Sequence, residues 1–114
     1  MQKVKTVRKA TRMKSISKCK TVAELLSRTS RWTKGQYAVD SEGEVVSPRS
    51  KKAERFCLLG ACKRVYGNGK KSQKMMNKLR DAVRTYGFYG VPEFNDNEGV
   101  HFWTVKRAIK LAGV

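Results

Sequence analysis

Three side chains of this sequence have the chemistry of a nucleophilic enzyme: Cys57, Asp96 and the single histidine, His101. A thiol, a carboxylate and an imidazole form a catalytic triad wherever a fold brings them together. Cys57, however, stands inside the apolar run 56–62, where a thiol is usually a small core residue. We therefore expect no enzymatic activity and no catalytic residues, and a cysteine-dependent enzyme remains a minor alternative.

The other thiols and the glycine-rich stretch do not point to a cofactor. Cys57 and Cys62 are five residues apart, which is not the CxxC spacing of a zinc site. The turn 66–72, Tyr-Gly-Asn-Gly-Lys-Lys-Ser, lacks the GxxxxGK[ST] spacing of a P-loop. We expect neither a metal nor another cofactor. With Cys19 the number of cysteines is odd and no secretory signal is visible, which indicates reduced thiols and a cytoplasmic location.

Charge is the dominant global property of the chain. Its 114 residues include 26 Lys and Arg against nine Asp and Glu, which gives a net charge of +17. Such a surface attracts polyanions. No apolar run approaches the roughly 18 residues that span a bilayer, so we expect a soluble protein and no membrane partner.

We expect the partner to be DNA or RNA, bound through the phosphate backbone and largely without sequence specificity. The sequence shows no helix-turn-helix, zinc finger, RNA-recognition signature or GXXG clamp. Phe88 and Tyr89 have two interpretations: they stack on bases or they plug the end of the core. The predicted nucleic-acid-binding residues are Lys3, Lys5, Arg8, Lys9, Arg12, Lys14, Lys18, Lys20, Lys51, Lys52, Lys70, Lys71, Phe88 and Tyr89.

An alternative of another class is an accessory protein that docks on an acidic face of a host or virion protein. A strongly basic surface would accelerate that association equally well. Residues 1–20 hold eight basic and no acidic residues, and we expect them to form an arm without a stable fold of its own. This arm is a binding arm that orders on phosphates, a solubilising segment or a targeting segment.

The elements that position these residues are mostly helices, so the expected fold class is mainly α (α+β). We predict one small domain over residues 21–114, with about four helices and a short β-hairpin behind the basic arm. Thr21 and Glu24 form a capping box that starts a helix to about Arg31, and Gly35 is suited to a C-terminal cap. Residues 36–39 and 44–46 flank an acidic turn and predict the hairpin.

The second half of the chain predicts three further helices. The central run 55–63 favours a buried helix over a buried strand, and Gly60 would let a neighbouring helix approach closely. Ser72 is expected to cap a helix from Gln73 to about Tyr86. The last helix is expected from about Val100 or His101 to Leu111, and Gly113 stops it. Its predicted core-facing residues are Trp103, Val105 or Lys106, Ile109 and Ala112. Asn95 and Asp96 are expected to cap this last helix and to fix the preceding loop through hydrogen bonds from side chain to backbone.

Three blocks of the sequence follow one another in a familiar order: Trp32…Gly35-Gln36…Ala38…Asp40…Gly43, then Arg55-Phe56-Cys57-Leu58-Leu59-Gly60-Ala61, then Phe94-Asn95-Asp96…Gly99…Val105. In this order the chain resembles a family of short bacterial and phage proteins known as a domain of unknown function. The likeness covers residues 21 to about 112. It implies a mostly helical fold and a phage or mobile-element origin, hence a host-cell cytoplasm, and it implies no reaction. A Thr-His pair often opens the final helix in this family. Here Val100-His101-Phe102 stands in its place, so that Phe102 occupies the position of the family's histidine.

Overall fold

The computed structural model describes residues 14–114. About half of the chain is helical, and the only strands of the described part form one antiparallel pair, so the predicted mainly α fold is confirmed. The elements are, in order, η1 (Ile16–Lys18), α2 (Val22–Leu25), η2 (Thr29–Arg31), β1 (Ala38–Val39), β2 (Arg55–Phe56), α3 (Leu58–Tyr66), α4 (Lys70–Thr85), α5 (Val91–Asp96) and α6 (Phe102–Ala112).

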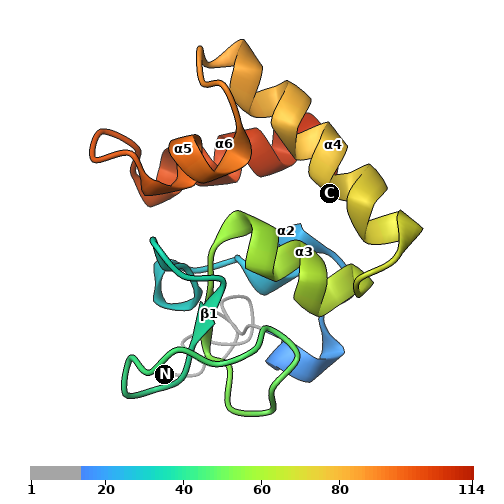
Figure 1. Cartoon of the computed structure of the whole chain (residues 1–114), viewed down its shortest axis with the longest axis vertical. Helices are drawn as coiled ribbons and strands as arrows, with labels where there is room; N and C mark the ends of the chain where they lie inside the picture. The colour runs from blue at the N-terminus through green and yellow to red at the C-terminus, as the bar shows by residue number, and fades with distance from the viewer. Residues whose placement is uncertain (1–13) are drawn as a thin grey trace, which may run out of the picture.

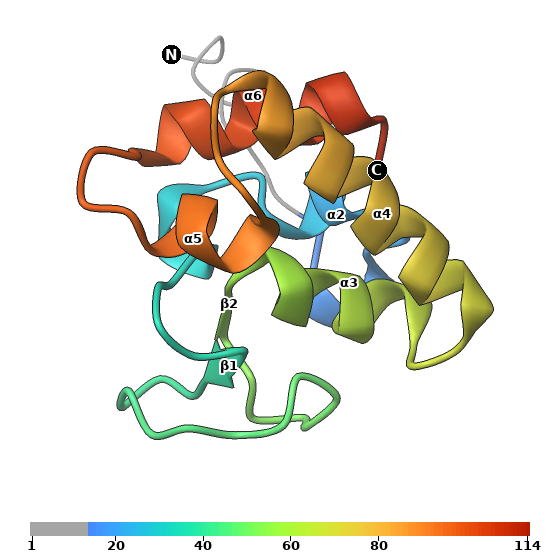
Figure 2. The same cartoon turned by 45° about the horizontal axis from the view of Figure 1, so that its top comes forward.

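The helices enclose one hydrophobic core. α4 packs against both α3 and α6, and the short α2 lies between α3 and α6 (Figures 1 and 2). The strand pair and the loop between its strands extend from one end of this helical body (Figure 2). Within residues 14–114 no helix is both long and apolar enough to cross a bilayer. The largest fully buried side chains are Phe56, Phe94, Leu25, Leu26, Leu58 and Leu79.

The central run divides at Cys57 instead of forming one helix. Arg55 and Phe56 are extended and pair with β1 in the register Ala38–Phe56 and Val39–Arg55. The helix α3 begins only at Leu58, with Cys57 as its N-cap. The expected turn after β1 is present, since Val39 also bridges Val45, but the main partner of β1 is the distant β2.

The first helix is shorter than predicted. Thr21 caps it as expected, because its Oγ1 accepts a hydrogen bond from Glu24 N at 3.0 Å. The Glu24 carboxylate accepts from Lys20 N, however, and not from Thr21 N. α2 ends at Leu25, and the buried Arg31 guanidinium donates to the Leu25 carbonyl oxygen at 3.5 Å and to that of Lys14 at 2.6 Å.

Three expectations for the second half are corrected. The predicted third helix starts at Lys70 rather than Gln73, so Ser72 is a buried residue of its first turn and not its cap. Residues 91–96 form the additional helix α5. In α6, Trp103 faces solvent with 57% of its surface exposed, whereas Ile109 is buried as predicted. Gly113 ends α6 with φ +76°, also as predicted.

Candidate nucleic-acid interface and the pocket at Cys57

The basic residues predicted to bind nucleic acid lie in several parts of the fold. Five of them, Lys3, Lys5, Arg8, Lys9 and Arg12, are outside the described residues. Lys14, Lys18 and Lys20 are exposed beside η1 and α2. The Lys14 ammonium pairs with the Glu24 carboxylate at 2.8 Å, which raises the pKa of Lys14 and lowers that of Glu24. At least one cation of the arm is therefore engaged with the protein itself.

Lys51 and Lys52 are exposed in the turn before β2. Lys52 shares a shallow hollow with three acidic residues, Asp40, Glu42 and Glu54. These carboxylates offset the positive potential there, so this part of the surface attracts phosphate less than its lysines suggest.

Lys70 and Lys71 are exposed on the first turn of α4. The first backbone hydrogen bond of this helix is from Gln73 N to Gly69 O, and no side chain caps its N-terminus. The free N–H groups and the helix dipole favour an anion at this end. The Lys71 ammonium also lies 5.5 Å from the centre of the Tyr66 ring.

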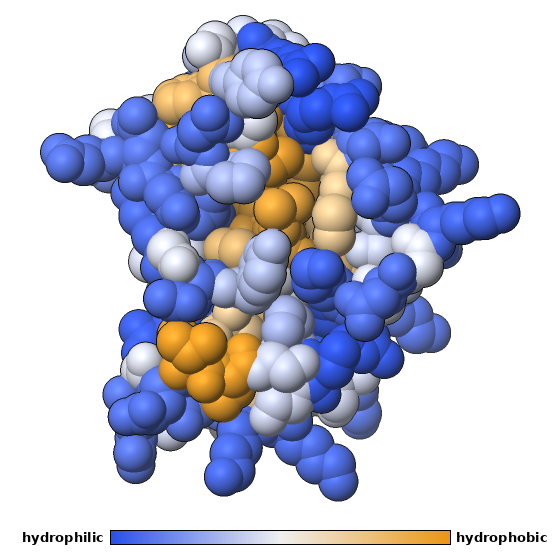
Figure 3. All heavy atoms as spheres, viewed as in Figure 1, coloured by the Kyte–Doolittle hydropathy of each residue, from blue (hydrophilic) through white to orange (hydrophobic). Residues whose placement is uncertain are grey.

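The lysines of α4 continue as a row. Lys70, Lys74 and Lys78 are exposed and follow one another at i, i+4 and i+8, which places them on one helix face at steps of about 6 Å. Over residues 55–80, which form β2, α3 and most of α4, the chain has eight basic and no acidic residues. Hydrophilic side chains project along the α4 side of the molecule, beside an apolar strip (Figure 3).

Two arginines extend this surface over the end of α3. Arg49 Nη1 donates to the carbonyl oxygens of Lys63 (3.3 Å) and Arg64 (2.7 Å). Arg64 Nη1 donates to those of Pro48 (2.9 Å) and Ser50 (2.7 Å). Burial lowers the pKa of Arg64, and the positive charge of Arg49 lowers it further.

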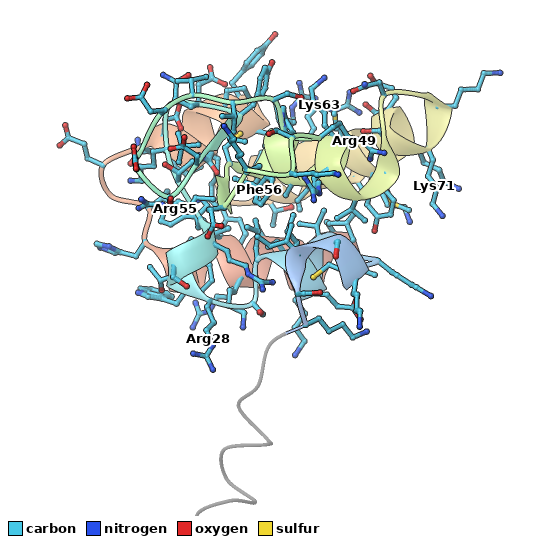
Figure 4. The ribbon with its side chains drawn as sticks, turned by 90° about the horizontal axis from the view of Figure 1, so that it is seen from below. Arg28, Arg49, Arg55, Phe56, Lys63 and Lys71 are labelled. Atoms are coloured by element: carbon cyan, nitrogen blue, oxygen red, sulfur yellow. The ribbon has the colours of Figure 1, made fainter. Side chains whose placement is uncertain are left out.

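Figure 4 shows Arg49 and Lys63 close together over α3, with Lys71 at the adjoining end of α4. The ion pairs within residues 14–114 are Lys14–Glu24 and Arg80–Asp81, so the cations of this surface have no carboxylate partner there. We call it the α3–α4 basic surface and define it as Arg49, Lys63, Arg64, Lys70, Lys71, Lys74 and Lys78.

The two aromatic residues of the loop after α4 have different surroundings. Phe88 is half-buried and packs edge-on against Phe94, with ring centres 5.2 Å apart, so it plugs the end of the core. Tyr89 is 77% exposed and lies 5.5 Å from the Arg84 guanidinium. Of the pair, Tyr89 is the one whose ring is exposed.

Cys57 and Asp96 line a common pocket of about 230 Å³ between α3, α5 and the segment before β1. Cys57 Sγ accepts a hydrogen bond from Gly60 N at 3.3 Å, and burial raises the pKa of this thiol. His101 is not among the lining residues; it is exposed and stacks on Trp103. The structure thus brings together two of the three residues with catalytic chemistry and leaves the imidazole elsewhere.

Asn95 joins the segments around this pocket rather than capping α6. Its side-chain oxygen accepts from Trp32 Nε1 (2.8 Å) and Leu58 N (3.0 Å), and its amide donates to Thr33 O (3.1 Å) and to Asp96 (2.8 Å). Asp96 Oδ1 also accepts from Gly35 N at 2.9 Å. Because Asn95 is buried and fully hydrogen-bonded, its role is to hold three distant segments together.

The three segments that Asn95 connects are the three blocks on which the family resemblance rests. The sequence model of a family of unknown function, DUF6197, matches residues 17–112. The chain belongs to this family. No curated protein and no solved structure matches it. In this DUF6197 domain the three blocks meet at one structural junction around Asn95.

The binding residues predicted from the sequence do not include four cations of the α3–α4 basic surface of this DUF6197 domain: Lys63, Arg64, Lys74 and Lys78. The signal was present in the sequence as the long stretch, residues 55–80, that lacks any acidic residue. Arg49 was overlooked too, and only the fold brings it onto the end of α3.

Proposed function

We propose that this protein binds nucleic acid through its phosphate backbone, with the α3–α4 basic surface as the main contact. The observation that carries the proposal is the concentration of cations without carboxylate partners on two packed helices. Burial lowers the pKa of Arg64, and repulsion from the neighbouring charge of Arg49 lowers it further. A polyanion would relieve this repulsion.

The arrangement favours contact with phosphates over contact with base edges. Lys70, Lys74 and Lys78 present point charges at steps of about 6 Å along a straight helix, and lysine offers no fixed hydrogen-bond fork. Phosphate contacts position a protein on nucleic acid without reading its sequence. The binding should therefore be similar on unrelated sequences and strongly dependent on salt.

The test is a pair of triple variants with equal charge. Lys70→Ala/Lys74→Ala/Lys78→Ala removes the row on α4, and Lys106→Ala/Arg107→Ala/Lys110→Ala removes three cations from α6. Binding to a labelled DNA duplex is measured by fluorescence anisotropy at several salt concentrations. If all three α4 lysines contact phosphates, the log–log salt slope of the first variant falls by about 2.7 units, at roughly 0.9 per phosphate.

The second variant should change the salt slope by less than about 1 unit, because its three cations lie outside the proposed contact surface. If only the total charge mattered, both variants would lower the slope alike. Circular dichroism checks that both variants keep their helices. Equal slopes for the two variants would mean that net charge and not this surface causes binding, and no binding by the unchanged protein would remove the proposal altogether.

A further inference from the structure

The exposed side of α6 carries large apolar side chains for which phosphate binding has no use. Trp103 is 57% and Leu111 is 56% exposed, which makes them two of the most exposed large apolar residues of the described chain. With Arg107 between them they follow at i, i+4 and i+8, so Trp103 and Leu111 are about 12 Å apart along one helix row. The Arg107 guanidinium lies 5.0 Å from the centre of the Trp103 ring.

A groove of about 390 Å³ lies beside this row, between α2 and α6. Its apolar lining comes from Ala23, Leu26 and Ile109, and its basic lining from Lys106, Arg107 and Lys110. α6 contains no acidic residue. The acidic residue of α2, Glu24, is already bound to Lys14 and to Lys20 N, both at 2.8 Å. The groove thus combines an apolar floor with positive charge along its α6 edge.

We propose that this α6 face binds an acidic amphipathic helix of a partner protein. We define the α6 face as Trp103, Arg107 and Leu111 together with the groove residues Ala23, Leu26, Lys106, Ile109 and Lys110. Apolar side chains at i and i+7 of such a helix are about 10.5 Å apart, which matches the spacing of Trp103 and Leu111. Carboxylates on its flanks would meet three cations that have no acidic partner within residues 14–114.

Nucleic acid fits this face less well. Phosphates would satisfy Lys106, Arg107 and Lys110, but Leu111 and the floor of the groove would gain no apolar contact. A membrane surface also fits less well, because the apolar residues Val105 and Ala108 of α6 are fully buried in the core. The large apolar side chains that α6 exposes, Trp103 and Leu111, are eight residues apart and form no continuous apolar side. The proposal goes beyond nucleic-acid binding and concerns a separate surface.

The test uses a fluorescent synthetic helix with Leu at positions i, i+3, i+4 and i+7 and mainly Glu elsewhere, and a scrambled peptide of the same composition. At physiological salt the full-length protein should bind the amphipathic peptide at least about tenfold more tightly than the scrambled one. Trp103→Gln and Leu111→Gln leave the net charge unchanged, and each should weaken binding by about tenfold. Tyr89→Gln, which removes another exposed aromatic ring, is the matched control and should have no effect.

Several results would overturn the proposal. Equal binding of the two peptides would show that charge alone is recognised, and an equal loss in Tyr89→Gln would show that the peptide binds elsewhere. If Trp103→Gln and Leu111→Gln instead weakened binding to a single-stranded oligonucleotide or to phosphatidylserine vesicles, and not to the peptide, the face would belong to those partners. Since either variant alone can be scored, loss of helical signal in one leaves the other as the test.

Discussion

Gly60 is the position at which the packing of this protein tolerates least change. A Cβ atom at Gly60 would lie 1.9 Å from the Tyr37 carbonyl oxygen, whereas real Cβ atoms essentially never come within 3.0 Å of another atom. In Gly60→Ala the backbone of residue 37 or α3 must therefore move by about 1.1 Å. The group that closely approaches Gly60 is the backbone of Tyr37, just before β1. The sequence had predicted that a neighbouring helix would approach Gly60, and this prediction was wrong.

The size of the effect follows from three contributions. Overpacking costs about 1–3 kcal/mol, and weakening the hydrogen bond from Cys57 N to Tyr37 O (3.2 Å) costs about 1 kcal/mol. The better helix propensity of alanine returns about 1 kcal/mol. The net loss of roughly 1–3 kcal/mol corresponds to a melting temperature lower by about 5–20 °C for a domain of this size.

The assay is thermal unfolding followed by circular dichroism, with Gly69→Ala as the matched control. Gly69 is the N-cap of α4, has an ordinary negative φ of −102° and would present its Cβ to open space. We expect its melting temperature to change by less than about 5 °C. A Gly60→Ala protein as stable as Gly69→Ala would refute the close approach of residue 37 to α3.

Two further predictions concern the cysteines and the N-terminal arm. Burial raises the pKa of Cys62 from 9.0 to about 12, so this thiol ionises in the unfolded chain before it ionises in the folded protein. The melting temperature should therefore fall as pH rises from about 9 towards 12, and it should fall less steeply in Cys62→Ala. An equally steep fall with pH in the two proteins would contradict this. Deleting residues 1–13 removes five basic side chains and should lower the log–log salt slope of DNA binding by at most about 4.5 units. Deleting residues 1–20 should also lower the melting temperature, because Ile16 and Cys19 pack on the core. An unchanged salt slope after the first deletion would show that the arm does not contribute to binding.

Features that depend on neighbouring residues could be read from the sequence. The Thr21 cap, the stop of α6 at Gly113 and the mostly helical fold arise from local hydrogen bonding and periodicity, which a short segment already contains. The positive charge of residues 55–80 is likewise a property of composition. The sequence therefore determined the kind of fold and the strongly positive charge of the chain.

Features that depend on distant segments were decided only by the tertiary structure. β1 pairs with the distant β2 as well as with the nearer residues 44–46. The backbone of Tyr37 accepts a hydrogen bond from Cys57 N, the residue at which the central run divides. Asn95 bonds Trp32 and Thr33, some 60 residues away, so its role has no local signature. Trp103 follows the helical period but lies outside the core, since the packing of α6 against α4 and α2 decides which of its faces is buried.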